Sequence, residues 1–301
     1  LHVPGIQLDI ANGLWAQEGH PFCADFLKIA TDEYRATVNP ADFRSQADAV
    51  AREINRWVAE KTNDKIQNIL PPGSVNSVTR LVLANAIYFK GAWADPFKNR
   101  YTTIKPFHLA GSSQTDAPLM SQTGDFKYAE NKDFQIIELP YIGGALSMVI
   151  LLPRRIDGCD GLENQLTAAL LSSSLGRLQR QTVEVYLPRF KLESSFDLNN
   201  TLAQMGMPDA FDLSRADFSG MDGTRQLFIS GVFHKAWGEI NEEGTEAAAA
   251  TSKNIALLSI EGPSPLPPPV FRADHPFIFL IREVRSGSLL FLGRLADPVA
   301  S

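Results

Sequence analysis

The feature that most constrains this fold is a tract of small and proline-rich residues at positions 242–269, near the end of the chain. The tract opens with Glu-Glu-Gly-Thr-Glu, continues through four alanines at 247–250, and closes with five prolines between Pro263 and Pro269. Such a composition is typical of a linker. The apolar segment that follows, 277–293, is too short to fold alone. We therefore expect the tract to be a long loop within a single domain spanning residues 1–301.

The rest of the chain combines helices near its start with strands throughout. Apolar residues three and four apart predict an amphipathic helix over 43–58, with Ser45 and Asp48 as a capping pair. A second helix is predicted over 21–35, with Pro21 in its first turn, and weaker patterns lie at 161–176 and 197–205. Short β-branched or aromatic runs predict strands at 81–89, 134–139, 146–152, 182–187, 227–237, 277–281 and 289–292.

The order of these elements indicates the fold class. Strands and helices do not alternate regularly, which favours an α+β domain over a doubly wound parallel sheet. Several of the strand runs do not alternate between apolar and polar residues, so we expect them to be buried on both faces. The last two strands, joined by residues 285–288, are close enough to form an antiparallel hairpin.

Composition excludes several classes of function. With 28 basic and 34 acidic side chains the net charge is −6, which disfavours binding to nucleic acid. The longest apolar runs are far shorter than the roughly 18 residues that span a bilayer, so no membrane helix is expected. The two cysteines, Cys23 and Cys159, allow at most one bridge, and free thiols are the simpler interpretation.

The sequence carries no signature of a catalytic or metal site. Its five histidines, at positions 2, 20, 108, 234 and 275, lie outside metal-ligand spacing, and neither cysteine belongs to a Cys-x-x-Cys pair. A nucleophile elbow, a phosphate-binding glycine loop and a dinucleotide fingerprint are all missing. We therefore expect no enzyme activity, metal or cofactor, and interpret His234 as a buried, hydrogen-bonded side chain.

The start of the long tract has the chemistry of a latent strand. Residues 244–251 have small side chains except at Glu246, so little resists their entry between two neighbouring strands. In an extended conformation Thr245, Ala247, Ala249 and Thr251 would face the same way. Pairing on both sides gives every backbone group a partner, at about 0.5–1.5 kcal/mol net for each hydrogen bond. A loop of this kind can become a strand.

At these residues the sequence resembles the serpins, serine protease inhibitors of the suicide-substrate type, and the resemblance covers nearly the whole chain. Residues 242–251 resemble the hinge of an inhibitory member, and residues 271–298 resemble the C-terminal strands of the family. Segments 83–93 and 233–236 match as well. The resemblance implies a single serpin-like α+β domain with a large mixed sheet, smaller β-sheets, several packed helices and a long exposed reactive loop at 242–269.

What the resemblance implies for function is a bait mechanism. A serine endopeptidase attacks the loop, forms an acyl-enzyme and is carried across the molecule as the cleaved loop inserts into the large sheet, a form of strand addition. Leu258 lies fourteen residues beyond Gly244 and precedes Ser259, so the expected reactive bond is Leu258–Ser259. Leucine suits a chymotrypsin-like or elastase-like pocket.

The resemblance also assigns roles to individual residues. Asn85 and His234 are expected to meet under the sheet where its strands part, and Trp93 to lie near the point of loop entry. Glu242 is expected to pair with Arg189 and fix the base of the hinge. The hinge itself is expected to comprise Glu242, Gly244, Thr245, Glu246, Ala247, Ala248, Ala249 and Ala250.

Three features of the sequence depart from the family pattern. The stretch after the expected reactive bond is longer than usual, which leaves a bond nearer Ile260 to Gly262 open. Lys253 falls on the same alternate set as Thr245 and would point toward the core on full insertion, where a buried ammonium is costly. The helices that family members carry before a strand like Ile6 to Trp15 are not seen in this sequence, so it leaves open whether the chain folds or inhibits alone.

The alternative to an inhibitor is a non-inhibitory serpin that acts as a binding or carrier protein. By resemblance, the expected partner is a serine endopeptidase held in a covalent complex, the protein is expected to be a monomer, and its location is expected to be extracellular or periplasmic.

Overall fold

The structure, a computed structural model, describes residues 2–3, 5–34, 36–111, 113–245 and 267–299. The chain divides into two compact units, each built from separate stretches of sequence. We call the first the hinge unit; it comprises Leu1–Gln7, Lys90–Lys191 and Gly238–Ser301. The second, the ladder unit, comprises Leu8–Phe89 and Leu192–Trp237. The single domain expected from the sequence stays a prediction.

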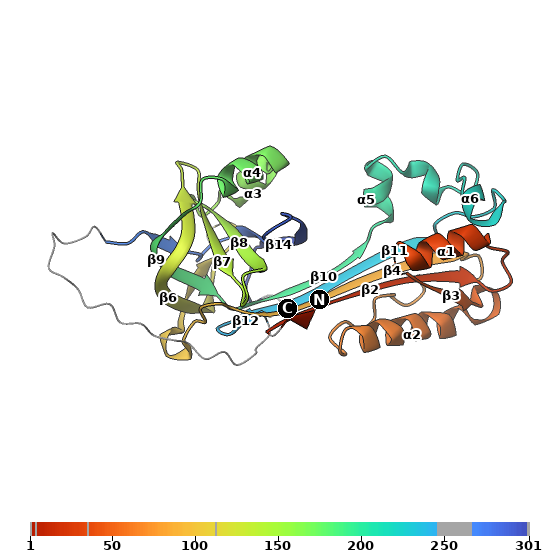
Figure 1. Ribbon diagram of the computed structural model, residues 1–301, viewed down its shortest axis with the longest axis horizontal. Coiled ribbons are helices and arrows are strands. Elements are labelled where there is room, and N and C mark those ends of the chain that lie inside the picture. Colours follow the sequence, from red (N-terminus) through yellow and green to blue (C-terminus); the bar gives the residue numbers. More distant parts are fainter. Residues whose placement is uncertain (1, 4, 35, 112, 246–266, 300–301) are drawn as a thin grey trace. The chain divides into compact units, whose positions relative to one another are not determined.

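One sheet has seven strands and mixed direction (Figure 1). Its strand order is β1-β2-β4-β12-β11-β10, and β3 pairs with β2. In the ladder unit β4 and β11 run parallel and pair from Val82 with Gly231 to Tyr88 with Trp237. The strands of this sheet are β1 His2–Val3, β2 Ile6–Gln17, β3 Thr37–Ala41, β4 Leu81–Ala92, β10 Phe190–Asp197, β11 Gly231–Asn241 and β12 Gly244–Thr245.

The hinge unit contains an eight-stranded sheet, ordered β13-β9-β6-β7-β8-β14-β15, with β5 paired to β6. Helices α3 Cys159–Gln165 and α4 Ala168–Leu175 pack against it, and every residue of β8 is buried, as expected for a strand covered on both faces. The hairpin expected at the end of the chain is present, because β14 and β15 pair antiparallel. The strands are β5 Thr103–His108, β6 Gln114–Glu130, β7 Phe134–Pro140, β8 Leu146–Pro153, β9 Gln179–Pro188, β13 Val270–Arg272, β14 Phe277–Glu283 and β15 Leu289–Leu295.

The longest helix, α2 Phe43–Lys61, follows the predicted periodicity. Phe43, Val50, Ile54 and Val58 are buried on one face, in an apolar cluster with residues of β4 and β11. The predicted cap was wrong, because Asp42 accepts the hydrogen bond from the Ser45 amide at 3.2 Å. A Ser45–Asp48 pair would lie inside the helix, where an N-terminal cap has no free amide to satisfy.

The first helix, α1 Ala24–Asp32, is shorter than the predicted 21–35. The Cys23 amide donates to the Met221 carbonyl at 2.8 Å, which holds the preceding residues in an extended path, so Pro21 lies outside the helix. Both cysteines are free. The remaining helical elements are η1 Asn99–Tyr101, α5 Asn199–Gln204, η2 Pro208–Phe211 and α6 Ser219–Asp222.

Sequence patterns missed the strand β6, Gln114–Glu130, which is the longest of the described strands. Its exposed positions are polar, and burial falls irregularly at Ala117, Leu119, Met120, Phe126 and Tyr128. Ladders with β5, β7 and β9 hold this strand extended, and such long-range pairing leaves little trace in a local pattern.

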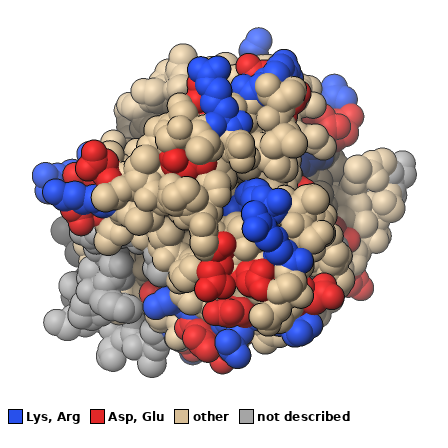
Figure 2. All heavy atoms as spheres, turned by 90° about the vertical axis from the view of Figure 1, so that its right-hand side faces the viewer, with Lys and Arg blue, Asp and Glu red and all other residues tan. Residues whose placement is uncertain are grey.

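On the face drawn in Figure 2, Lys and Arg side chains lie next to Asp and Glu side chains. No helix within the described residues is long and apolar enough to cross a membrane. Over the same residues, no group of three or more His, Cys, Asp or Glu side chains is placed to hold a metal ion.

Candidate functional site

The site begins at the tight turn that joins β11 to β12 in the hinge unit. The side chain of Asn241 accepts a hydrogen bond from the Glu243 amide at 3.0 Å and closes the turn. Gly244 has φ of 144°, and a Cβ there would lie 2.0 Å from the Gly91 carbonyl oxygen. Only glycine fits this conformation and this approach to β4. The turn therefore sends the chain back along the sheet.

After the turn, the chain lies between two strands. Gly244 pairs antiparallel with Ala92 of β4, and also with Asn241 of β11. Thr245 pairs likewise with Gly91 and Ile240. Thr245 has no exposed surface. The two residues of β12 thus already occupy a central place in the sheet.

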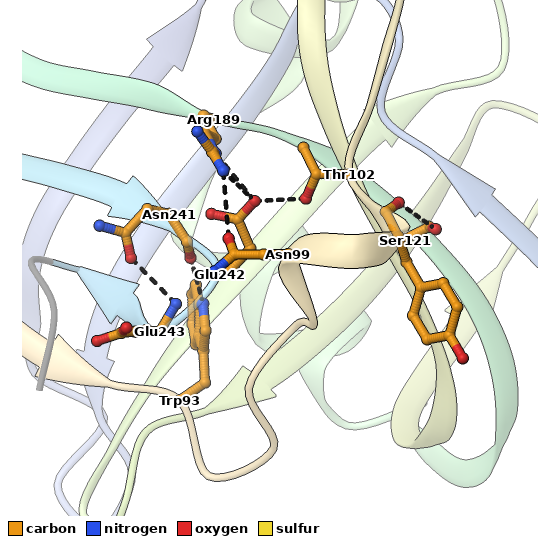
Figure 3. Close-up of polar contacts among 9 residues, drawn as sticks. Trp93, Asn99, Thr102, Ser121, Arg189, Asn241, Glu242 and Glu243 are labelled. Carbon is orange, nitrogen blue, oxygen red and sulfur yellow. Dashed lines mark hydrogen bonds and ion pairs between the residues drawn. The ribbon is translucent and has the colours of Figure 1, made fainter. Parts of the chain in front are cut away.

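Trp93 is packed beside this turn, as the close-up in Figure 3 shows. Its indole Nε1 donates to the Asn241 carbonyl at 3.0 Å, and its amide donates to the Glu243 carbonyl at 2.8 Å. The indole stacks on Tyr141, with ring centroids 4.7 Å apart. The hydroxyl of Tyr141 lies 2.8 Å from the hydroxyl of Thr245, and burial raises the pKa of this phenol. Trp93 and Tyr141 together fix the first turn of the hinge.

Arg189 and Glu242 form an ion pair at the base of the hinge (Figure 3). Oε1 of Glu242 accepts from Nη2 of Arg189 at 2.5 Å and from Nε at 2.9 Å, and Thr102 donates to the same carboxylate. Burial by itself raises the pKa of Glu242, but the hydrogen bonds from Arg189 and Thr102 outweigh it and hold the pKa below 4.5. The Glu242 side chain is 5% exposed and that of Arg189 43% exposed, so the carboxylate is the buried partner.

Asn85 and His234 meet in the ladder unit. They are register partners on β4 and β11, and Oδ1 of Asn85 lies 2.6 Å from Nδ1 of His234. The Asn85 amide donates in turn to the side chain of Asn12 on β2, so polar contacts link three strands. The ring of His234 lies parallel to that of Phe196, with centroids 6.3 Å apart, and burial lowers the histidine pKa from 6.5.

Two members of this polar row, Asn12 and Asn85, line an apolar cavity in the ladder unit. The cavity has a volume of about 490 Å³. The other lining residues are mostly apolar, and Leu83 and Val232 belong to the wall. A strand added between β4 and β11 would therefore present alternate side chains to this cavity.

The structure thus brings together Arg189 with Glu242, Asn85 with His234, and Trp93 with the turn. Sequence reasoning missed Asn12, Thr102 and Tyr141. Asn12 had a signal, because it is an amide within an otherwise apolar run, whereas nothing in the sequence relates Thr102 or Tyr141 to the hinge. The reactive-bond residues Leu258 and Ser259, the residue Lys253, and the hinge residues Glu246, Ala247, Ala248, Ala249 and Ala250 lie outside the described residues.

Comparisons with known proteins agree on one family. The family model described as "Serpin (serine protease inhibitor)" matches residues 2–298. Leukocyte elastase inhibitor A of Rattus norvegicus is 42% identical over 299 residues, which cover 97% of this chain and 78% of the rat protein. The structure of uncleaved ovalbumin superposes with a TM-score of 0.86 at 34% identity, covering 97% of this chain and 74% of that one.

A structure of thyroxine-binding globulin in complex with thyroxine superposes equally well. Its TM-score is 0.86 at 27% identity, over 98% of this chain and 77% of that one. The family model and the 42% identical relative are decisive, since both extend over nearly the whole sequence. The protein described here is therefore a member of the serpin family.

Proposed function

We propose that the protein is a suicide-substrate inhibitor of serine endopeptidases with chymotrypsin-like or elastase-like specificity. The catalytic serine of the protease attacks the carbonyl carbon of Leu258, and its hydroxyl proton passes through the protease's own base to the amine of Ser259. The peptide bond breaks as an ester bond forms. Water would complete hydrolysis of this ester unless the protease is first distorted by insertion of the freed loop. The inhibitor is consumed, so it is not a catalyst.

One observation carries this proposal, namely that Gly244 and Thr245 already pair with both β4 and β11. A loop that leaves the sheet at its edge would first need a gap to enter, whereas here the first two residues lie in the place of a new central strand. Extension of the same register would add one residue at a time. Each added backbone hydrogen bond contributes about 0.5–1.5 kcal/mol net.

The sequence beyond Thr245 suits this extension. Four alanines at 247–250 offer no bulk to resist entry. In the register of β12, Thr251 would lie opposite Asn85 on β4 and His234 on β11, where its hydroxyl could join their polar row. The alanines would enter the sheet first, where bulk would hinder insertion, and Thr251 would follow at the polar row, where a hydroxyl can form hydrogen bonds.

The leucine at 258 supports the target class. Its side chain is apolar and of moderate size, and it offers no charge to a trypsin-like pocket. The rat relative is named for inhibition of leukocyte elastase, which is consistent with this choice. The reactive bond is taken as Leu258–Ser259, with a bond nearer Ile260 to Gly262 as the competing position.

The test is incubation with chymotrypsin and with elastase, followed by denaturing electrophoresis and mass spectrometry. We expect an SDS-resistant complex and a released fragment that begins at Ser259. A fragment beginning between 260 and 263 would move the reactive bond without changing the mechanism. Complete cleavage with no complex would contradict inhibition.

The second candidate function is that of a binding or carrier protein. Thyroxine-binding globulin shares the fold, but a shared fold is compatible with both functions, and the elastase-inhibitor relatives do not favour this alternative. The two candidates differ in what cleavage does to stability. An inserting loop raises the melting temperature, whereas a loop that stays outside the sheet leaves it unchanged.

The remaining expectations follow from the proposed mechanism and the family. The partner is a serine endopeptidase held through an acyl bond, and each trapped protease is bound to one inhibitor molecule, which requires only a monomer. An extracellular or periplasmic location stays a prediction.

A further inference from the structure

Two aromatic side chains close the direct ladder between β4 and β11. Tyr88 and Trp237 are its last register pair on the side nearest the hinge. Their rings stack, with centroids 5.8 Å apart and planes 29° from parallel. Tyr88 is only 3% exposed, and Trp237 packs against the apolar cluster beneath α2. The two strands are therefore joined at this point by side chains as well as by backbone.

A lysine from the segment between α2 and β4 lies over the Trp237 ring of this pair. Nζ of Lys65 lies 4.6 Å from the centroid of the Trp237 ring, within the range of a cation–π contact. The residues that follow Lys65 anchor this segment, because Ile66, Ile69 and Leu70 are at most 2% exposed. Lys65 thus adds a third component to the stack, from the segment that joins α2 to β4.

The register of β12 shows which hinge residue would meet this pair. Thr245 lies opposite Gly91 on β4 and Ile240 on β11. In an antiparallel strand each further residue moves one position back along both neighbours. If the loop inserts in this register, Ala248 would lie opposite Tyr88 and Trp237 at the same time. It is the first hinge residue whose entry would separate a directly paired couple of β4 and β11.

We propose that the Tyr88–Trp237 stack, covered by Lys65, is a latch that sets the rate at which β4 and β11 separate for the entering loop. This inference rests on the proposed function and deepens it. Insertion of the loop competes with hydrolysis of the acyl bond. Faster separation of β4 from β11 should therefore trap more protease, and slower separation should release more. Tyr88, Trp237 and Lys65 are positioning residues in this scheme, since none of them contacts the protease or the reactive bond.

The first test measures sheet opening without a protease. A synthetic peptide of residues 245–258 is incubated with the protein, and its uptake is followed by native electrophoresis and by the rise in melting temperature. We expect Trp237→Ala to speed uptake about tenfold, as loss of an aromatic pair allows. Trp237→Phe keeps a stacked ring and should restore a rate near that of the parent protein. Lys65→Met should give a smaller acceleration in the same direction.

The matched control is Trp57→Ala. Trp57 is also partly buried against the same cluster and is also paired with an aromatic ring, that of Trp15 at 5.0 Å, but this pair does not join β4 to β11. Its removal should destabilise the cluster without speeding uptake. The latch would be overturned if Trp57→Ala accelerated peptide uptake as much as Trp237→Ala does. It would also be overturned if neither Trp237→Ala nor Lys65→Met accelerated uptake.

The second test measures partition with the protease. The association rate should be the same for the parent protein and Lys65→Met, while the number of inhibitor molecules consumed per trapped protease should fall in the variant. A change in association rate alone would count against a role in opening. If no covalent complex forms with any variant, yet Trp237→Ala still speeds peptide uptake and Trp57→Ala does not, the latch stands and the proposed inhibition fails.

Discussion

Oδ1 of Asn85 lies 2.6 Å from Nδ1 of His234, across the two parallel strands between which the loop would enter. The carbonyl of Asn85 can only accept, so the hydrogen bond places a proton on Nδ1 of the histidine. The Asn85 amide is occupied by Asn12. This contact joins the strands in the uncleaved protein and has to be rearranged when a strand is added.

The buried His234 makes stability depend on pH. Burial lowers its pKa below 6.5 in the folded protein, so between this folded pKa and 6.5 the unfolded state binds more protons. The contribution of neutral His234 is therefore complete above pH 6.5 and is lost as the pH falls below that value. His234→Gln should flatten this part of the profile, whose slope for one proton is at most about 1.4 kcal/mol per pH unit. Urea unfolding at pH 7.5 and 5.5 measures it, and equal slopes in the two proteins would contradict the assignment.

Replacing either partner of the ion pair at the base of the hinge should lower the stability of the protein, but by different amounts. Arg189→Ala leaves the 5% exposed carboxylate of Glu242 without its cation, whereas Glu242→Gln leaves a guanidinium that is 43% exposed and can be hydrated. We expect Arg189→Ala to cost about 1–2 kcal/mol of unfolding free energy after allowance for solvent screening, and Glu242→Gln to cost less. Thermal unfolding at pH 7 measures both. A larger loss from Glu242→Gln would refute this order.

The same pair predicts sensitivity to acid. The pKa of Glu242 is held below 4.5 in the folded protein, so its contribution to stability is present above pH 4.5 and disappears as the pH falls through the lower, folded value. In Arg189→Ala the carboxyl should titrate at higher pH, because burial then acts with less opposition. The difference in stability between the parent protein and Arg189→Ala should therefore shrink on acidification from pH 7 to 3. A constant difference would show that the charge of Glu242 plays no part.

Insertion should depend on the size and charge of residue 245. Thr245 is fully buried and its hydroxyl contacts Tyr141, so Thr245→Arg would place a guanidinium in an apolar setting at a cost of several kcal/mol. We expect the protease to cleave this variant at a normal rate and to escape, with the covalent complex reduced at least tenfold. Thr245→Ser keeps the hydroxyl and serves as control. Densitometry of the SDS-resistant band decides the matter, and an undiminished band in Thr245→Arg would exclude insertion through this position.

Lys253 should limit the stability gained on insertion. In the register of β12 it would lie opposite Leu83 and Val232, both in the wall of the apolar cavity. Lys253→Ala should therefore raise the melting temperature of the cleaved protein by on the order of 2 °C or more, because a buried ammonium is removed. Asn254→Ala falls on the opposite face and should change it little. Calorimetry before and after cleavage compares them, and an equal gain in both variants would argue against this register.

Much of the architecture was accessible from local patterns. The spacing of Phe43, Val50, Ile54 and Val58 was enough to predict α2, because an amphipathic helix repeats its apolar residues every three or four positions. The apolar run of β8 indicated a strand buried on both faces. The strand β6 was not predicted, because pairing with three other strands stabilises it and its own residue pattern does not indicate a strand.

The candidate site divides in the same way. By itself the sequence determined the family, most of the regular helices and strands, and the presence of a small-residue tract able to become a strand. These features depend on residue type and on spacing along the chain. Only the tertiary structure decided that Gly244 and Thr245 already pair with two strands, that Thr102 and Tyr141 contact the hinge, and that Tyr88 and Trp237 stack at the end of the β4–β11 ladder. Apart from the short turn between β11 and β12, these contacts join residues more than a hundred positions apart. The register between such distant strands is set by long-range pairing that no local pattern encodes.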